Sequence, residues 1–207
     1  MIYDISPLLS PRLAVWPGDM PLSREVTCDL ARGDAVTLSS LRATVHLGSH
    51  ADAPIHYVPG PAIHERDLEL YLGPAQLIRV EVARGMRILP EQLRCEVRAP
   101  RVLLCTGTYP DPEKFTTDFA SLSVALVDYL AAKGVRLIGI DTPSVDLFSS
   151  TDFEAHHAIA RHDIAILEGL VLAEVPEGVY ELIALPLRLE GFDASPVRAV
   201  LRNKPPA

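Results

Sequence analysis

The chain lacks the marks of a membrane or secreted protein. It has no uninterrupted run of about 18 apolar residues, the length that spans a bilayer as a helix. Asp4 stands early in an N-terminus without a basic stretch before an apolar core, so no signal peptide is predicted. Its three cysteines, Cys28, Cys95 and Cys105, form no CxxC pair, which favours reduced thiols and a cytoplasmic location.

Positive charge is also scarce. Lys and Arg number 19 against 27 Asp and Glu, the formal net charge is −8, and no basic stretch is dense. Nucleic-acid binding needs a basic face that neutralises phosphates, so a general nucleic-acid partner is not expected. Other motifs are missing too: no GxGxxG follows the first strand, no P-loop lysine motif occurs, and no GxSxG elbow supports a serine hydrolase.

The composition that remains is that of a globular protein. The 207 residues are 48% hydrophobic and 22% charged, and no repeat or compositional break divides them, so one domain over 1–207 is predicted. Apolar, β-branched runs predict strands at 2–5, 35–47, 75–82, 101–106, 135–140, 164–172 and 179–189, and in "VRAVLR" near the end.

Two segments have helical periodicity. Apolar residues recur at three- and four-residue intervals over 123–134, and Gly134 supplies the stop. Residues 151–162 are a second helix candidate, with Thr151 or Asp152 available as its N-terminal cap. "PEQL" is expected to open a short third helix, and "NKPPA" reads as a frayed end.

The order of these elements indicates the fold class. Residues 101–140 read as strand, helix, strand, which predicts at least one crossover connection between parallel strands. Because predicted strands outnumber helices, a sheet-rich, mixed α/β domain is expected.

Three of the seven histidines crowd into "HLGSHADAPIH", residues 46–56. Gly48 breaks the preceding strand, so a loop leaving the sheet is predicted here. In an extended "HAD", alternation places His50 and Asp52 on one side, and His46 joins them only if the Gly48 turn folds back. Histidine with carboxylate is a ligand mix for zinc or manganese, and aspartate can bridge two ions. The alternative is a polar loop with ordinary hydrogen bonds.

A second set of candidates lies in "FEAHHAIARHDIAILEGL". A carboxylate in an apolar strand is costly to bury unpaired, so Glu168 needs a metal or an arginine. Adjacent residues of a helix point about 100° apart, so only one of His156 and His157 is expected to face the site. The single tryptophan, Trp16, lies in a loop and suits either core packing or stacking on an aromatic ligand.

These residues resemble the HxGTHxDxPxH signature of the metal-dependent cyclase family. Similarity to its formamidase branch runs along nearly the whole chain, through "YDISPLL", "WPGD", "GIDTPSVD", "HHAIARHDIAILEGLVL" and "YELIALPLRLEGFDASPVRAVL" in that order. Ser49 stands where the broader signature has threonine, and both carry a hydroxyl. The resemblance implies a swivelling β/β/α fold and a homodimer. It also implies hydrolysis of N-formyl-L-kynurenine to L-kynurenine and formate in tryptophan degradation.

Carried over residue by residue, the resemblance implies two zinc ions per subunit, with manganese as another possible metal. His46, His50 and Asp52 would hold the first ion, and Asp52 would bridge to the second. His156 would bind the second ion, and Glu168 would reach both.

The resemblance also makes His56 the catalytic acid/base and Trp16 the tryptophan that contacts an aromatic amide substrate. Two alternatives stay open. The same ligands would serve a related amidohydrolase of another aromatic or cyclic amide, such as isatin. A structural metal site in a binding protein is the other, but such sites are usually closed by four ligands and often contain cysteine. The cysteines here lie far from the cluster in sequence, which favours an open, catalytic site.

Overall fold

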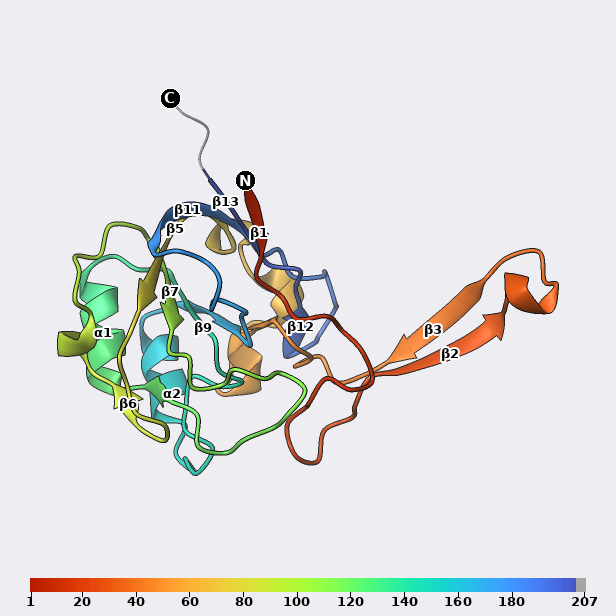
Figure 1. The fold of residues 1–207 in the computed structure, drawn as a ribbon. Helices are drawn as coiled ribbons and strands as arrows, with labels where there is room; N and C mark the ends of the chain where they lie inside the picture. Colours follow the sequence, from red (N-terminus) through yellow and green to blue (C-terminus); the bar gives the residue numbers. More distant parts are fainter. Residues whose placement is uncertain (204–207) are drawn as a thin grey trace.

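One large curled sheet organises the computed structural model, which describes residues 1–203 (Figure 1). The last four residues of the segment expected to fray, "NKPPA", lie outside the described residues. Nine strands are hydrogen-bonded in the order β1 (Ile2–Asp4), β13 (Val200–Arg202), β11 (Gly178–Ile183), β5 (Leu72–Arg79), β7 (Arg101–Cys105), β9 (Leu137–Ile140), β10 (Ala165–Glu168), β4 (His50–Asp52) and β12 (Ala194–Pro196).

The centre of the sheet is parallel. Strands β5, β7, β9 and β10 pair side by side in the same direction, whereas the strands on both flanks are antiparallel. Helix α1 (Val124–Ala132) connects β7 to β9, and α2 (Glu154–Arg161) connects β9 to β10. The expected crossover and the sheet-rich α/β class are confirmed.

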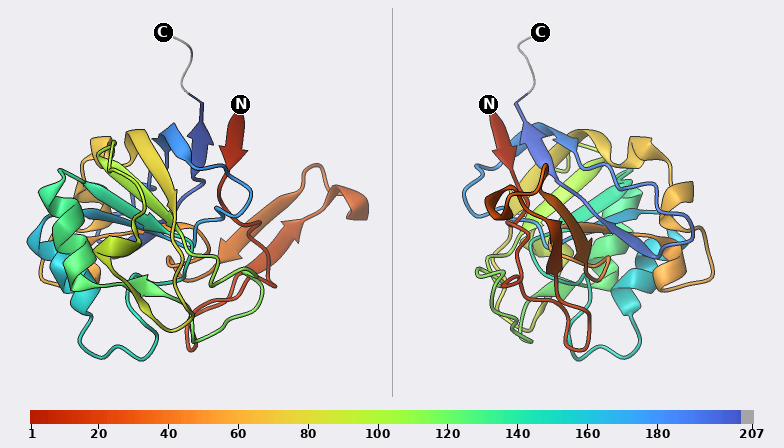
Figure 2. Two further views of the ribbon diagram at one scale, coloured as in Figure 1. Left: turned by 60° about the vertical axis from the view of Figure 1, so that its left-hand side comes forward. Right: turned by 90° about the vertical axis from the view of Figure 1, so that its right-hand side faces the viewer.

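Alternation along the central strands divides the core between two faces of the sheet. Ile138 and Ile166 pack with buried side chains of both helices, including Leu126 and Ile159. The neighbouring residues in the strands point to the opposite face, where a second cluster gathers under the flanking strands and loops; it includes Leu103, Leu137, Leu167, Tyr71 and Leu201. Both helices lie together on one side of the sheet (Figure 2).

Helix α1 forms where the apolar periodicity predicted it, and it stops at the predicted glycine. The Ser123 side chain accepts a hydrogen bond from the backbone N–H of Leu126, and Gly134 has a positive φ of 79° just beyond the end of the helix.

The third helix expected in "PEQL" is a 3-10 turn, Pro90–Gln92. Further 3-10 turns are Leu30–Arg32, Pro54–His56, Ile63–Glu65 and Leu68–Leu70, and two short strands, β6 (Arg87–Ile88) and β8 (Ser121–Leu122), pair in parallel.

Helix α2 is capped differently from the prediction. Neither Thr151 nor Asp152 caps it, and the residue before its first turn is Phe153, which has a left-handed φ of 47°. The carboxylate of Asp146 accepts the backbone N–H groups of Ala155 and of the next residue instead. The expected cap is therefore wrong, because a distant carboxylate supplies the acceptor that a local one normally provides.

The strand expected over residues 35–47 is also wrong at both ends. Only Leu38–Arg42 is extended, as β3, and it pairs with β2 (Ser23–Cys28) in a hairpin separate from the main sheet. Figures 1 and 2 show this hairpin, in orange-red, projecting from the body of the molecule. Every residue of β3 is exposed, so its two leucines, Leu38 and Leu41, do not mark a buried face.

The stretch "HLGSHADAPIH" corrects another expectation. Residues His50–Asp52 form β4 inside the main sheet, between β10 and β12, although a loop leaving the sheet was expected. A strand of three residues is too short to show a periodicity of its own. Within residues 1–203, no helix combines the length and the apolar character that are needed to pass through a bilayer.

Candidate metal centre

Strand β4 presents His50 and Asp52 on one face of the sheet. All three residues of the strand are buried, and Ala51 between them packs into the core on the other face. The antiparallel register with β10 sets Glu168 directly opposite His50, and their Oε2 and Nε2 atoms are 3.2 Å apart. The carboxylate of Glu168, on the apolar strand β10, is therefore buried against His50. Among the described residues, no arginine pairs with Glu168.

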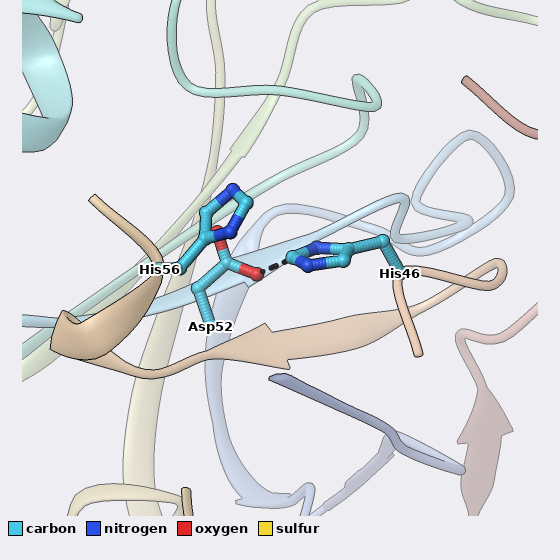
Figure 3. A group of neighbouring side chains, drawn as sticks. All are labelled: His46, Asp52 and His56. Atoms are coloured by element: carbon cyan, nitrogen blue, oxygen red, sulfur yellow. Dashed lines mark ion pairs between the residues drawn. The ribbon is translucent and has the colours of Figure 1, made fainter. Parts of the chain in front are cut away.

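A glycine turn brings His46 to the same place. Gly48 has a positive φ of 60°, and the chain folds back so that Nδ1 of His46 lies 3.2 Å from Oδ1 of Asp52. His56 ends the 3-10 turn after β4, and its ring centroid is 4.3 Å from that of His46. Figure 3 shows both rings directed towards the Asp52 carboxylate.

Helix α2 supplies the remaining histidine. His156 is buried, and its Nε2 lies 3.7 Å from Oδ2 of Asp52 and 3.7 Å from Oε1 of Glu168. His157, the other half of the doublet, is exposed. His162 pairs with Asp128 on the surface through a contact of 2.7 Å.

The two carboxylates divide the cluster into two groups of donor atoms. Oδ1 of Asp52 faces His46 and His50, while Oδ2 of the same residue faces His156. Glu168 repeats the division, because Oε2 faces His50 and Oε1 faces His156. Each carboxylate thus offers one oxygen to each group.

The buried donor atoms fit a divalent metal. Nε2 of His50 and both carboxylate oxygens of Asp52 have no hydrogen-bond partner among the described residues. A buried carboxylate without hydrogen bonds is costly, and a bound cation removes that cost. Imidazole nitrogen with carboxylate oxygen is a donor set for zinc, and manganese also accepts it.

The ring nitrogens that face away from the centre all have acceptors. Ligand histidines in metal sites usually donate their second N–H to such a group, which fixes the ring orientation. The three contacts are His46 Nε2 to Asp193 Oδ2 at 3.0 Å, His50 Nδ1 to the Gly48 carbonyl at 2.9 Å, and His156 Nδ1 to Asp146 Oδ2 at 2.9 Å.

The charges of the centre depend strongly on one another. Burial lowers the pKa of His46, but the adjacent Asp52 and Asp193 outweigh burial and raise this pKa to about 9. Burial also opposes protonation of His156, whose pKa is nevertheless raised to about 10 by Asp146 and Asp52. Burial would raise the pKa of Asp52, yet the neighbouring histidines hold it well below its usual range.

A cavity of about 570 Å³ opens onto this centre. His46, His56 and Glu168 line it, together with aromatic side chains that include Trp16 and Phe153. The indole of Trp16 is held by other rings: its centroid lies 5.0 Å from that of Phe148 and 5.5 Å from that of Phe115. The cavity therefore combines the polar cluster with aromatic residues suited to a flat apolar group.

His56 has two possible uses in this geometry. One ring nitrogen of His56, one of His46 and one oxygen of Asp52 lie within 4.8 Å of one another, so the three residues can share an ion. His56 is also more exposed than His46 and faces the cavity, which suits a residue that exchanges protons with a ligand.

Two residues of the site were not singled out from the sequence. Asp146 ends the block "GIDTPSVD" and Asp193 lies in "LEGFDASP", and both accept from histidines of the cluster. No local pattern distinguishes them from surface aspartates. Their position within segments shared with a known family was the one available signal.

Comparison with known proteins identifies relatives. Residues 3–147 match the family described as "Putative cyclase". A protein of Bordetella petrii named kynurenine formamidase is 45% identical over 205 residues, covering 98% of each chain.

Solved structures agree on the fold. A potential metal-dependent hydrolase with cyclase activity is 26% identical, with a TM-score of 0.85 over 100% of this chain and 99% of its own. A predicted metal-dependent hydrolase from Bacillus stearothermophilus is 28% identical, with a TM-score of 0.81 over 97% of each chain. An isatin hydrolase bound to thioisatinate is 19% identical, with a TM-score of 0.84 over 97% of this chain and 91% of its own, and it shares the fold.

Proposed function

The chain belongs to the putative cyclase family, and we propose that it is a metal-dependent hydrolase that converts N-formyl-L-kynurenine to L-kynurenine and formate. One arrangement carries the hydrolase part of this proposal: the buried Asp52 carboxylate, which has no hydrogen-bond partner among the described residues, lies against His46 and His156, and these two line a cavity with aromatic residues. The choice of substrate is supported by the 45% identity with the relative named kynurenine formamidase. The groups involved lie on one sheet, its loops and helix α2, which supports a single domain over residues 1–207.

We assign two ions, zinc or alternatively manganese, to the two groups of donor atoms. His46 and His50 would hold the first ion, and His156 the second. Asp52 and Glu168 would bind both ions, because each carboxylate directs one oxygen at the first group of donor atoms and the other oxygen at the second. When bound, a divalent metal lowers the pKa of water from about 15.7 towards about 7 and polarises a carbonyl.

The reaction needs three things from the protein's own residues. Trp16 and the neighbouring rings bind the aryl group and keep bulk water from it. The polar residues that line the cavity set the formamide against the cluster, where the oxygen of water adds to the formyl carbon and His56 takes up the proton that this water loses. The carbon–nitrogen bond then breaks, and His56 gives this proton to the departing aryl amine nitrogen, so that formate and the amine are released. An imidazole exchanges protons readily near neutral pH, which suits this step.

The metal content and the activity are tested together. The purified protein is assayed with N-formylkynurenine as isolated, after chelation, and after zinc or manganese is restored. We expect about two metal ions per chain and activity that chelation removes and metal restores. A fully loaded protein without activity on this substrate would rule out the proposed function.

The histidine doublet offers a matched pair of variants for the second ion. His156→Ala is expected to lose one equivalent of metal, because its ring faces Asp52 and Glu168. His157→Ala removes the same chemical group from the exposed side of the same helix and should retain both ions. Equal metal content in the two variants would contradict the assignment.

A related activity on another aromatic or cyclic amide, such as isatin, is the second candidate. It is favoured by the likeness of fold to the isatin hydrolase, and the cavity has room for a fused ring. Because both reactions need the same ligands, only a side-by-side assay of the two substrates separates them.

We further propose a cytoplasmic homodimer. All three cysteines are free, which is typical of a reducing compartment. The β2–β3 hairpin exposes Leu30, Val36, Leu38 and Leu41, and a two-stranded hairpin is only marginally stable on its own. Packing against a second copy of the chain would cover it. Light scattering should give twice the chain mass, and the double variant Leu38→Ser, Leu41→Ser should shift the protein towards the monomer.

A further inference from the structure

Asp193 is held beside the candidate metal centre by the edge of the main sheet. It immediately precedes β12, whose first residue, Ala194, pairs with Asp52 on β4. The carbonyl of Asp193 accepts a hydrogen bond of 2.8 Å from the backbone N–H of Ala53. Its backbone is therefore fixed one residue from a candidate ligand, while its side chain, 45% exposed, lines the cavity.

One carboxylate oxygen of Asp193 lies against two imidazole rings. Oδ2 is 3.0 Å from Nε2 of His46 and 3.5 Å from Nδ1 of His56. Asp193 forms no ion pair with a lysine or arginine among residues 1–203, so the two histidine rings are the titratable groups that its carboxylate contacts. The same oxygen thus contacts a candidate metal ligand and the candidate proton donor.

The contact with His46 determines which of its nitrogens can bind metal. Since Nε2 of His46 donates to Asp193, the neutral ring that binds metal would carry its lone pair on Nδ1, which is the atom 3.2 Å from Asp52. His50 and His156 are arranged the other way, with Nδ1 donating to the protein and Nε2 facing the carboxylates.

The contact with His56 has a similar effect. With Nδ1 of His56 directed at Asp193, the opposite nitrogen, Nε2, is left for a ligand in the cavity. The rings of His46 and His56 also pack against each other, with their centroids 4.3 Å apart, so Asp193 contacts two rings that touch.

We propose that Asp193 is a positioning residue that orients His46 for binding metal through Nδ1 and His56 for proton transfer through Nε2. This inference rests on the proposed function for the role of His56. Its action at His46 concerns metal binding alone and does not depend on which substrate is used. Carboxylates that orient ligand histidines typically affect metal affinity or activity by about 10- to 100-fold.

The first test compares Asp193→Ala with Glu190→Gln. Glu190 lies on the same loop and is exposed, so its variant removes a nearby charge without touching the cluster. Zinc affinity is measured by competition with a chromophoric chelator. We expect Asp193→Ala to weaken one of the two zinc affinities by about 10- to 100-fold, and Glu190→Gln to match the wild type. Asp193→Asn, which keeps an acceptor oxygen, should recover part of the loss.

Nitrogen NMR of the histidine rings reads the orientation directly. In the zinc-loaded protein, His46 should show a protonated Nε2, whereas His50 and His156 should show a protonated Nδ1. The resonances of His46 and His56 should both change in Asp193→Ala and stay in place in Glu190→Gln, with thermal denaturation showing that both variants are folded. Unchanged zinc affinity and unchanged His46 resonances in Asp193→Ala would overturn the proposal.

Kinetics separate this role from binding of a charged substrate group. A positioning residue should lower kcat in Asp193→Ala with little change in KM. A rise in KM alone would show that Asp193 contacts the substrate, and that would also overturn the proposal. If the wild-type protein does not hydrolyse N-formylkynurenine, the proposed function fails. The affinity and NMR measurements still decide the role of Asp193, because neither uses a substrate.

Discussion

The carboxylate of Asp146 is bound twice by His156. Its Oδ2 lies 2.9 Å from Nδ1 of the ring and 3.1 Å from the backbone nitrogen of the same residue. One side chain therefore caps helix α2 and sets the direction of the imidazole that the helix carries. Burial would raise the pKa of Asp146, but hydrogen bonds from His156 and Arg87 lower it to about 2.

Replacing Asp146 should damage stability and metal binding together. In Asp146→Asn an amide N–H₂ group meets the N–H donors that the carboxylate accepts. We expect a loss of about 1–3 kcal/mol in the free energy of unfolding and weaker binding of the second ion. Urea denaturation and chelator competition measure the two effects. Asp152→Asn is the control, since that exposed residue does not cap the helix, and it should change stability by less than about 0.5 kcal/mol. Equal effects of the two variants would contradict this account.

The roles of His56 and Asp52 can be separated by measuring metal content beside turnover. His56→Ala should retain both ions and lose about 10²- to 10⁴-fold in kcat, because it removes an acid/base group. Asp52→Ala should lose metal as well as turnover, because both of its oxygens face histidines of the cluster. Loss of one metal equivalent in His56→Ala would show that this residue is a ligand, as its proximity to His46 and Asp52 permits.

Trp16 is expected to contribute to binding and little to the chemical step. Its indole lies in the cavity wall, packed against Phe148 and Phe115. Trp16→Ala should raise KM for the aryl substrate by about 2- to 10-fold with a small change in kcat, since stacking is similar in the ground and transition states. Trp16→Phe keeps a ring and should recover most of the affinity. A fall in kcat without a change in KM would mean that Trp16 acts on the reacting group.

Substitution of Gly169, which directly follows Glu168, tests whether the backbone beside the candidate metal centre can accept an added methyl group. It has a positive φ of 65°, and an added Cβ would collide with the carbonyl oxygen of Gly48, the acceptor for His50. Gly134→Ala is a matched control, because its φ of 79° is also left-handed but its Cβ would meet open space. The control should lose about 1–2 kcal/mol from backbone strain alone. Gly169→Ala should lose more than this and also bind metal more weakly, as measured by denaturation and chelator competition. Equal losses in the free energy of unfolding for the two variants would mean that the backbone around Gly169 moves to accept the methyl group without further cost.

Cys105 should be the least reactive of the three thiols. It is buried, and burial together with the nearby Asp141 raises its pKa to about 11. The thiolate is the reactive form, so at about pH 8 Cys105 stays protonated and resists iodoacetamide. Its alkylation rate should rise as the pH approaches 11 or when the protein unfolds, whereas the exposed Cys95 is labelled in the folded protein. Peptide mass spectrometry gives the order, and rapid labelling of Cys105 in the folded protein at pH 8 would contradict it.

Local patterns were sufficient for much of the fold and for placing His50 and Asp52 on one face, whereas the full set of candidate site residues came from the family resemblance. The apolar runs predicted the central strands β5, β7 and β9, and the periodicity over 123–134 predicted α1 with its stop at Gly134. The spacing of His50 and Asp52 indicated a shared face, because side chains alternate along extended chain and this requires no knowledge of neighbours. Gly48 was expected to permit a turn, and the chain does turn there.

The position of Glu168 and the exposure of the β2–β3 hairpin depended on which strands are neighbours in the sheet. The register of β4 against β10 sets Glu168 opposite His50, and a shift of one residue would turn that carboxylate to the other face. The exposure of the β2–β3 hairpin likewise follows from its lack of a place in the main sheet.

Asp146 and Asp193 are two residues of the candidate site that local sequence patterns could not identify. Asp193 reaches His46 from 147 positions away and Asp146 reaches His156 from ten positions away, and the sequence around each aspartate looks like an ordinary turn or loop. The sequence by itself determined the kinds of donor and the faces they share, since these depend on side-chain chemistry and backbone period. Only the tertiary structure decided their partners and ring orientations, because long-range pairing and packing bring those groups together.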